Sequence, residues 1–375
     1  MTISFPNPID FEVVSTEQQL LSLEPEWRAL TERARDAQVF QTFDWVWPAW
    51  KCVASMRGRQ LHVIVGRNED RVVLIWPLVT YDQLGLRLAR TLDSETTEYR
   101  DLIIEGSAGS REIISQAWEF VTRRCGIDAV YIQYVPASSL LDAVARRGGG
   151  ITTDQEEHRY VDCREFADWS GYFRSRSTNR RSDLRRRRRR LEETGVVEVV
   201  RISTTEQLSG FLPWLFVTKI AALSGSDGPT DWFTAPQHKE FLTSLLHRGL
   251  KSGVGVATAL VVDGKYIAGK VDVDFRKTKT LLITTYDRDW ARFAPGVVLY
   301  EECLREAFDK GFHTVDFRIG DEPHKTNWTN RTGLVRDHWA PCTGKGRVYI
   351  AWRTSGLRKI MKRAYSRLRG VRPRV

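Results

Sequence analysis

Paired cysteines, long apolar runs and a secretion signal are missing from this 375-residue sequence. Its five cysteines lie far apart without CxxC spacing, so neither a disulfide framework nor a zinc site is expected. No apolar run approaches the ~20 residues that span a bilayer. Residues 1–10 show no basic segment followed by an apolar one. We therefore expect a cytoplasmic protein with buried free thiols and no bound metal.

The sequence also lacks the motifs of several large enzyme classes. It contains no GxGxxG, no GxxxxGK[ST], no HExxH and no GxSxG. Dinucleotide-dependent dehydrogenases, P-loop NTPases, zinc proteases and serine hydrolases therefore have no support.

Acidic residues are absent after Asp337, although lysine and arginine are frequent there. In the segment 353–375, apolar residues follow helical spacing with basic residues opposite, which is typical of a helix lying on an anionic membrane. Packing of the apolar residues on the protein's own core is an equally good interpretation. Peripheral contact with an anionic membrane is thus one predicted partnership.

A second basic cluster lies in the middle of the chain, at Arg180, Arg181 and residues 185–190. Leu184 and Leu191 lie seven residues apart on one helical face, so most of these arginines must point into solvent. They either form a solvated face balanced by nearby acids or bind an anion such as a nucleotide-sugar, a lipid phosphate or a tRNA backbone.

The length predicts two domains, since one domain takes roughly 150 residues. Glycines 148–150 mark a plausible boundary. Both halves have the order helix, hairpin, strand, helix, strand, which favours two related mixed α/β domains at 1–150 and 151–352, followed by the basic helix 353–375. The clearest local signals are helices at 110–124, 205–223 and 297–310, and a hairpin at Asp263-Gly264 between strands 256–262 and 266–275.

The most informative chemistry lies between residues 254 and 328. Pro295-Gly296 precedes an amphipathic helix, whose free N–H groups and dipole favour a phosphate, and glycine allows close approach. The predicted strand Leu281–Tyr286 offers an edge to which an amide-bearing arm can pair. Together they suit the diphosphate and pantetheine of an acyl-CoA. Taken alone, Pro-Gly would be a simple turn.

The motifs that stand out in this region are Asp263-Gly264, Ile267-Ala268-Gly269, Tyr286-Asp287, Pro295-Gly296, Asp316-Phe317, Gly320-Asp321-Glu322-Pro323, Lys325 and Trp328. With these motifs the region closely resembles the CelD-like acetyltransferases of cellulose and exopolysaccharide biosynthesis, which belong to the GNAT superfamily. The similarity extends more loosely to 40–50, the arginine-rich helix and 212–233. One departure is His324, where that family usually has tyrosine.

The resemblance implies two tandem GNAT-like domains, each a mostly antiparallel twisted sheet flanked by helices, with the acyl-CoA site in the second. It also implies a relation to the Fem-type transferases, which move amino acids from aminoacyl-tRNA. Their aromatic-lysine pair has a counterpart at Lys325, whose charge is expected to help bind substrate and offset negative charge.

Direct attack of an amine or hydroxyl on a thioester needs a base, an oxyanion donor and a proton source for the thiolate. We expect Asp321 as base or orienting group, although it could equally cap a helix. Tyr286 and Asp287 are further catalytic candidates. Without a catalytic role, Tyr286 would be a buried tyrosine at the end of a strand and Asp287 a turn residue. The expected cofactor-binding residues are Ile283, Thr284, Thr285, Pro295, Gly296, Val297 and Val298, and the expected substrate-binding residues are Asp316, Arg318, His324, Trp328 and Lys219.

Three functions remain open at this point. The leading expectation is an acyl-CoA-dependent N- or O-acyltransferase, using acetyl-CoA or another acyl-CoA and a small-molecule or glycan acceptor. The second is aminoacyl transfer from tRNA, which the arginines would suit. The third is a non-catalytic module that binds anionic surfaces.

Overall fold

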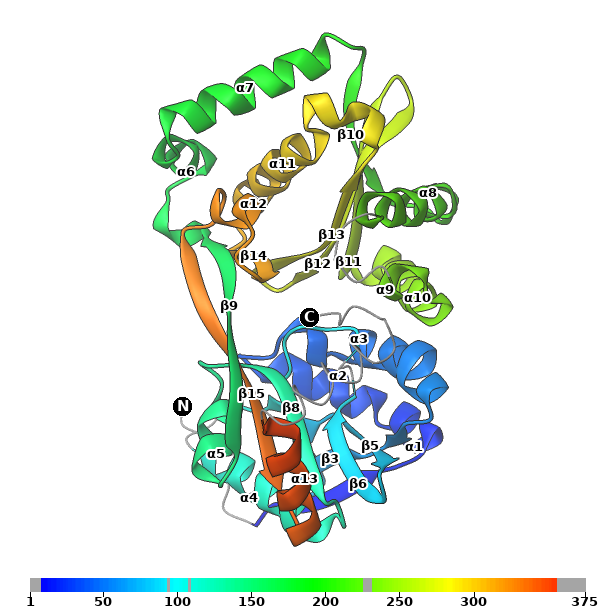
Figure 1. Ribbon diagram of the computed structural model, residues 1–375, viewed down its shortest axis with the longest axis vertical. Helices are drawn as coiled ribbons and strands as arrows, with labels where there is room; N and C mark the ends of the chain where they lie inside the picture. The colour runs from blue at the N-terminus through cyan, green and yellow to red at the C-terminus, as the bar shows by residue number, and fades with distance from the viewer. Residues whose placement is uncertain (1–7, 93–94, 107–108, 225–230, 356–375) are drawn as a thin grey trace, which may run out of the picture. The chain divides into compact units, whose positions relative to one another are not determined.

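The computed structural model describes residues 8–92, 95–106, 109–224 and 231–355 (Figure 1). The chain divides into two compact units that exchange segments. Unit 1 consists of Met1–Val46, Arg57–Glu156 and Leu334–Val375, and unit 2 consists of Trp47–Met56 and Glu157–Gly333. This division differs from the contiguous boundaries at 150 and 352 that the sequence suggested. The basic helix expected at 353–375 lies almost wholly outside the described residues.

Two long-range contacts explain the exchange. Strand β15 (Arg331–Pro341) pairs antiparallel with β8 (Ala129–Pro136) from Val335 onward, which brings the end of the chain into unit 1. The π-helical segment η2 (Ala49–Ala54) is mostly buried and packs against α10 (Pro236–Ser252), which brings residues 47–56 into unit 2. Neither contact can be predicted from local sequence patterns, because each joins residues that lie far apart in the chain.

Unit 1 contains two groups of hydrogen-bonded strands. One has the order β1-β3-β4-β7 with antiparallel neighbours, and the other has the order β15-β8-β6-β5-β2 with a parallel β6–β8 pair. The remaining elements of this unit are β1 (Asp10–Val14), α1 (Glu17–Ser22), α2 (Glu24–Arg33), η1 (Val39–Gln41), α3 (Phe43–Pro48, ending in unit 2), η3 (Ser55–Arg57, beginning in unit 2), β2 (Gln60–Leu61), β3 (Val63–Asn68), β4 (Arg71–Trp76), β5 (Leu78–Gln83), β6 (Leu86–Thr91), β7 (Ile103–Ile104), α4 (Ser110–Arg124), α5 (Leu140–Arg147) and α13 (Gly344–Thr354).

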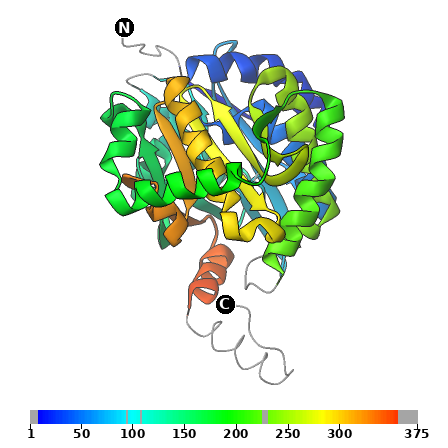
Figure 2. The same ribbon diagram turned by 90° about the horizontal axis from the view of Figure 1, so that it is seen from above.

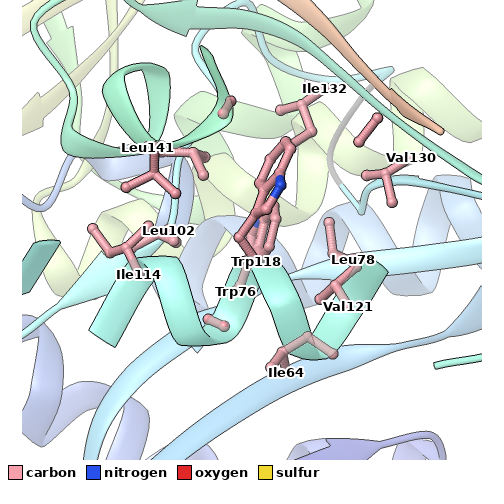
Figure 3. Packing of buried hydrophobic residues seen from close by; sticks show 14 of the residues in the cluster. Ile64, Trp76, Leu78, Leu102, Ile114, Trp118, Val121, Val130, Ile132 and Leu141 are labelled. Carbon is pink, nitrogen blue, oxygen red and sulfur yellow. The ribbon is translucent and has the colours of Figure 1, made fainter. Parts of the chain in front are cut away.

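The core of unit 1 lies between β3, β4, β8 and the helices α4 and α5 (Figure 3). Trp76 and Trp118 stack at its centre with ring centroids 5.9 Å apart. Ile64, Leu78 and Ile132 are fully buried around them. Since burying one large apolar side chain stabilises a fold by about 1.5–3 kcal/mol, this cluster gives unit 1 its own core.

Unit 2 has the strand order β10-β11-β12-β13-β14-β9. The β11–β12 hairpin turns at Asp263 and Gly264, both with positive φ (46° and 77°), as a two-residue Asp-Gly hairpin requires. That predicted turn is confirmed. The elements are β9 (Ile151–Asp162, beginning in unit 1), η4 (Cys163–Glu165), α6 (Trp169–Ser175), α7 (Thr178–Glu192), β10 (Val197–Ile202), α8 (Thr205–Leu223), α9 (Asp231–Thr234), β11 (Gly255–Val262), β12 (Lys265–Phe275), β13 (Thr278–Tyr286), η5 (Arg288–Phe293), α11 (Pro295–Asp309), β14 (Thr314–Ile319) and α12 (Pro323–Thr326).

Helices cover both faces of the unit 2 strands. Figure 1 shows α8 and α10 on one face and α11 on the other, and Figure 2 shows α7 lying across α11. Helix α8 begins with a capping box, in which Thr204 Oγ1 accepts from Gln207 N (3.2 Å) and Gln207 Oε1 accepts from Thr204 N (3.3 Å). Helix α11 forms the connection between the parallel strands β13 and β14.

Candidate active site

Strands β13 and β14 pair for only three residues, from Thr278 opposite Thr314 to Thr280 opposite Asp316. Beyond that point they separate, and the last part of β13 has an open edge. A cavity of about 600 Å³ lies there. It is lined by Arg180, Lys219, Leu281, Leu282, Ile283, Thr284, Tyr286, Ala291, Ala294, Gly296, Val297, Tyr300, Phe317, Arg318, Glu322, Lys325, Asn327 and Trp328.

The start of α11 forms one wall of this cavity. Ala294 adopts the left-handed conformation (φ 52°), and its carbonyl accepts from Val297 N (2.9 Å) and Val298 N (3.4 Å). A side chain at Gly296 would begin 3.4 Å from the Tyr286 ring, so glycine keeps this wall open. Gly296 and Val297 line the cavity, whereas Pro295 and Val298 do not. The first-turn amides are thus partly engaged before any ligand binds.

Two cationic side chains bind the open edge of β13. Lys219 Nζ, from α8, donates to the carbonyl of Thr284 at 3.0 Å. Arg318 Nη1, from β14, donates to the carbonyl of Leu282 at 2.9 Å. Arg318 has a positive φ (66°), and its backbone N–H donates to Asp316 Oδ1 at 2.8 Å. Such strain in a non-glycine residue is frequent at functional sites.

Lys219 has an unusual electrostatic environment. Burial, together with the nearby charge of Arg318, lowers its pKa to about 8. Its ammonium also lies 5.6 Å from the centre of the Phe233 ring. Lys219 therefore titrates close to neutral pH, which is uncommon for lysine.

Lys325 lies at the opposite wall, where α12 follows β14. Its ammonium donates to the Ile319 carbonyl and forms an ion pair with Glu322 Oε2 at 2.9 Å. Gly320, at φ 118°, precedes it, and an added Cβ there would lie 2.8 Å from Lys325 Nζ. Glycine at this position therefore allows the ammonium to approach the backbone.

Trp328 forms the floor beside α7. It is 1% exposed, and the Arg180 guanidinium lies 4.7 Å from its ring centre. Its carbonyl accepts from Tyr172 Oη and, at 3.4 Å, from Arg176 Nη1. The ring is thus held firmly, and Arg180 stacks on it by a cation–π contact.

The other predicted site residues are placed differently. Asp287 caps η5 by accepting from Asp289 N at 3.0 Å, and Asp321 is exposed and does not line the cavity. Asp316 and Thr285 are buried and do not line it either. The side chain of His324 lies outside what the structure describes. The structure therefore brings together Lys219, Ile283, Thr284, Tyr286, Gly296, Val297, Arg318, Lys325 and Trp328.

Sequence reasoning missed Tyr300 as a site residue. It lines the cavity from α11, four residues after Gly296 and so on the same helical face. Burial raises its pKa, against a hydrogen bond with Thr284 that lowers it, so the phenol stays protonated at neutral pH. Its ring centre lies 5.6 Å from that of Phe317. The i, i+4 spacing was the signal that could have found it.

None of the helices within 8–355 that the structure describes is long and apolar enough to cross a membrane. The same residues contain no group of three or more His, Cys, Asp or Glu side chains suited to a metal ion.

Residues 178–326 match the family model described as the acetyltransferase (GNAT) domain. No curated protein shows significant sequence similarity to this chain. The fold resembles the crystal structure of FemX, with a TM-score of 0.61 at 12% identity over 84% of this chain and 95% of that one. It also resembles L-PGS from Bacillus licheniformis, with a TM-score of 0.50 at 9% identity over 87% and 94%.

The matched segment contains the meander β11–β13, helix α11 and strand β14, and hence most of the cavity walls. The protein is a mixed α/β acyltransferase. More specifically, residues 178–326 match a GNAT-type acetyltransferase domain, and the expected likeness to Fem-type proteins is confirmed for the fold alone.

Proposed function

We propose that this protein transfers an acyl group, in the simplest case acetyl, from acyl-CoA to an amine or hydroxyl of a small-molecule or glycan acceptor. The observation that carries the proposal is the separation of β13 from β14 directly beside the start of α11, with a cavity of about 600 Å³ between them. A GNAT domain uses an acyl-CoA cosubstrate, and the family match covers this region.

In this proposal the pantetheine arm lies along Leu281–Tyr286 and the diphosphate lies at the start of α11. The arm's amides would pair with the edge of β13 that lies beyond its short pairing with β14. The dipole of α11 favours the diphosphate. Pro295, Val298 and Thr285 do not line the cavity. In this proposal they support the lining residues and do not contact the acyl-CoA.

The chemistry requires a donor for the oxyanion and a proton for the leaving thiolate. Backbone N–H groups of β13 would serve the oxyanion, an interaction that typically contributes about 10²–10³ in rate. Tyr300 is half-buried and its raised pKa keeps it protonated, and Tyr286 lines the same cavity, so either phenol can give its proton to the thiolate as the C–S bond breaks.

The acceptor must lose a proton as it attacks. Glu322 is the carboxylate among the cavity-lining residues, whereas Asp321 and Asp287 do not line the cavity. We assign the base to Glu322, with Lys325 holding it at 2.9 Å, and give Asp321 the lesser role of orienting the acceptor at the rim. The Asp316 carboxylate positions Arg318 by accepting a hydrogen bond from the Arg318 backbone N–H.

The resemblance to CelD-like acetyltransferases supports a role in polysaccharide, cell-envelope or small-metabolite synthesis, carried out in the cytoplasm. Contact of the segment 353–375 with an anionic membrane stays part of the proposal, although residues 356–375 lie outside the described structure. A second candidate is aminoacyl transfer from tRNA. It is favoured by the exposed Arg185 and Arg190 on α7 and by the fold shared with FemX.

Calorimetric titration with acetyl-CoA tests the leading function. In Gly296→Leu, the new side chain would contact Tyr286 and fill the part of the cavity beside the start of α11. The affinity for acetyl-CoA should therefore fall by about tenfold or more. Gly210→Leu on α8 is the matched control, because a Cβ there meets nothing within 4 Å. If the natural protein binds aminoacyl-tRNA with a steep salt dependence but no acetyl-CoA, the second candidate replaces the first.

A further inference from the structure

The cavity is markedly cationic. Arg180, Lys219, Arg318 and Lys325 line it, against the single carboxylate of Glu322. That carboxylate is already paired with Lys325 at 2.9 Å. A positive excess of this kind, enclosed by protein, favours an anionic ligand.

Lys219 has no acidic partner within ion-pair distance in the described parts of the chain. Its ammonium contacts the Thr284 carbonyl and the Phe233 ring. Removing an ammonium from water without a counter-ion is costly, and its pKa is lowered accordingly. A bound anion would offset that cost.

Arg180 is in a similar situation on the other wall. Its Nε is buried and makes no hydrogen bond to any described residue. The nearest acid along its helix, Asp183, is occupied by Arg186 (2.7 Å) and Arg187 (2.6 Å). One face of the Arg180 guanidinium lies on the Trp328 ring. Its N–H groups point outward in the plane of the guanidinium, where they can donate to an oxyanion.

These two cations come from different elements and different faces of the strands. Figure 1 shows α7, which carries Arg180, on the α11 side and α8, which carries Lys219, on the opposite side. We propose that the acyl acceptor carries an oxyanion, a carboxylate or a phosphate, that is bound by Lys219 and Arg180. This inference rests on the proposed function, because it names the acceptor class for the same cavity.

Binding of the acyl-CoA donor does not require Lys219 or Arg180. Its diphosphate is assigned to the start of α11, where Arg288 and Arg292 of η5 are exposed nearby. Lys219 and Arg180 instead line the cavity from α8 and beside Trp328. They are therefore available to a second ligand while the donor is bound.

The test is calorimetric titration of sulfate, and separately of acetate, into the full chain saturated with CoA. Lys219→Gln and Arg180→Gln should each weaken anion binding by about tenfold or more, because each removes one cationic donor. Lys239→Gln and Arg185→Gln are matched controls, since these cations also lie over aromatic rings, 5.6 Å from the centre of Phe216 and 5.7 Å from that of Phe173, but do not line the cavity. Lys219→Met serves if the glutamine variant does not fold.

The stronger of the two anions identifies the group as phosphate-like or carboxylate. The inference is wrong if neither anion binds, if the cavity variants bind as well as the controls (an adventitious ion only), or if CoA abolishes the binding, which would assign both cations to the donor. A separate acetyl-CoA titration keeps the two proposals distinguishable. Its failure removes the proposed function, whereas sulfate binding that depends on Lys219 and Arg180 would still establish the anion site.

Discussion

The ammonium of Lys270 donates to the carboxylate of Asp272 two residues along β12, and both side chains are almost completely buried. Lys279 of β13, also buried, pairs with Asp274 at 2.7 Å and with Glu306 of α11 at 3.5 Å. Burial alone lowers the pKa of Lys270, but the Asp272 carboxylate outweighs it and the pKa is raised. A charged network thus joins α11, which forms a wall of the cavity, to the strands beneath it.

Asp272→Ala should strongly destabilise unit 2. The substitution leaves Lys270 buried without its carboxylate, and breaking a buried pair from one side costs about 3–5 kcal/mol. Urea unfolding at pH 7 measures this loss. Glu157→Ala, which breaks the partly exposed pair with Arg159 (3.3 Å), should cost less than about 1 kcal/mol. Equal losses in the two variants would show that the buried pair is not coupled to folding.

Lys325→Ala should lower turnover by about tenfold or more while leaving the fold intact, because the ammonium lines the cavity and holds Glu322. Release of free thiol from acetyl-CoA measures turnover, and circular dichroism reports folding. Lys310→Ala is the matched control, since Lys310 forms an ion pair with Glu306 (2.5 Å) on α11 away from the cavity. A folded Lys325→Ala protein with unchanged turnover would remove this residue from the site.

Much of unit 2 was predictable because its signals are local. The Asp-Gly turn, the helix after Pro295-Gly296 and the limits of α8 follow from residues adjacent in sequence. In α7, the seven-residue spacing of Leu184 and Leu191 correctly predicted that both are buried. The pairing of Arg188 with Glu302 of α11 was not predictable, since it depends on how two distant helices pack.

The parts that sequence could not predict are those set by long-range pairing. The hairpin β5–β6 and the strand β15 leave no comparable local signal, and the continuous apolar run from Val72 to Val79 is divided between β4 and β5 of different sheets. The same limitation affects the cavity. Its opening depends on where β14 stops pairing with β13, and no residue pattern in either strand encodes that register.

Anion binding in the cavity should weaken above pH 8. The pKa of Lys219 is lowered to about 8, so its charge is largely present at pH 7 and largely lost at pH 9. Sulfate is the suitable probe because its own charge does not change over this range. Its affinity should fall by about tenfold between these pH values, since only the charged lysine attracts it. In Lys219→Gln the affinity should stay flat, and an equally steep fall there would assign the effect to another group.

Acid should destabilise unit 1 through His62, whose side chain is 5% exposed and whose Nε2 lacks a hydrogen-bond partner among the described residues. Burial, with a contribution from Arg87, lowers its pKa from 6.5 to about 4. Between these values the unfolded chain binds a proton that the folded chain does not, so stability falls as the pH drops below 6.5. Allowing for solvent screening, wild type should lose about 1 kcal/mol more than His62→Leu between pH 7 and pH 5 in urea unfolding. Parallel losses in both proteins would mean that His62 titrates alike in the folded and unfolded states.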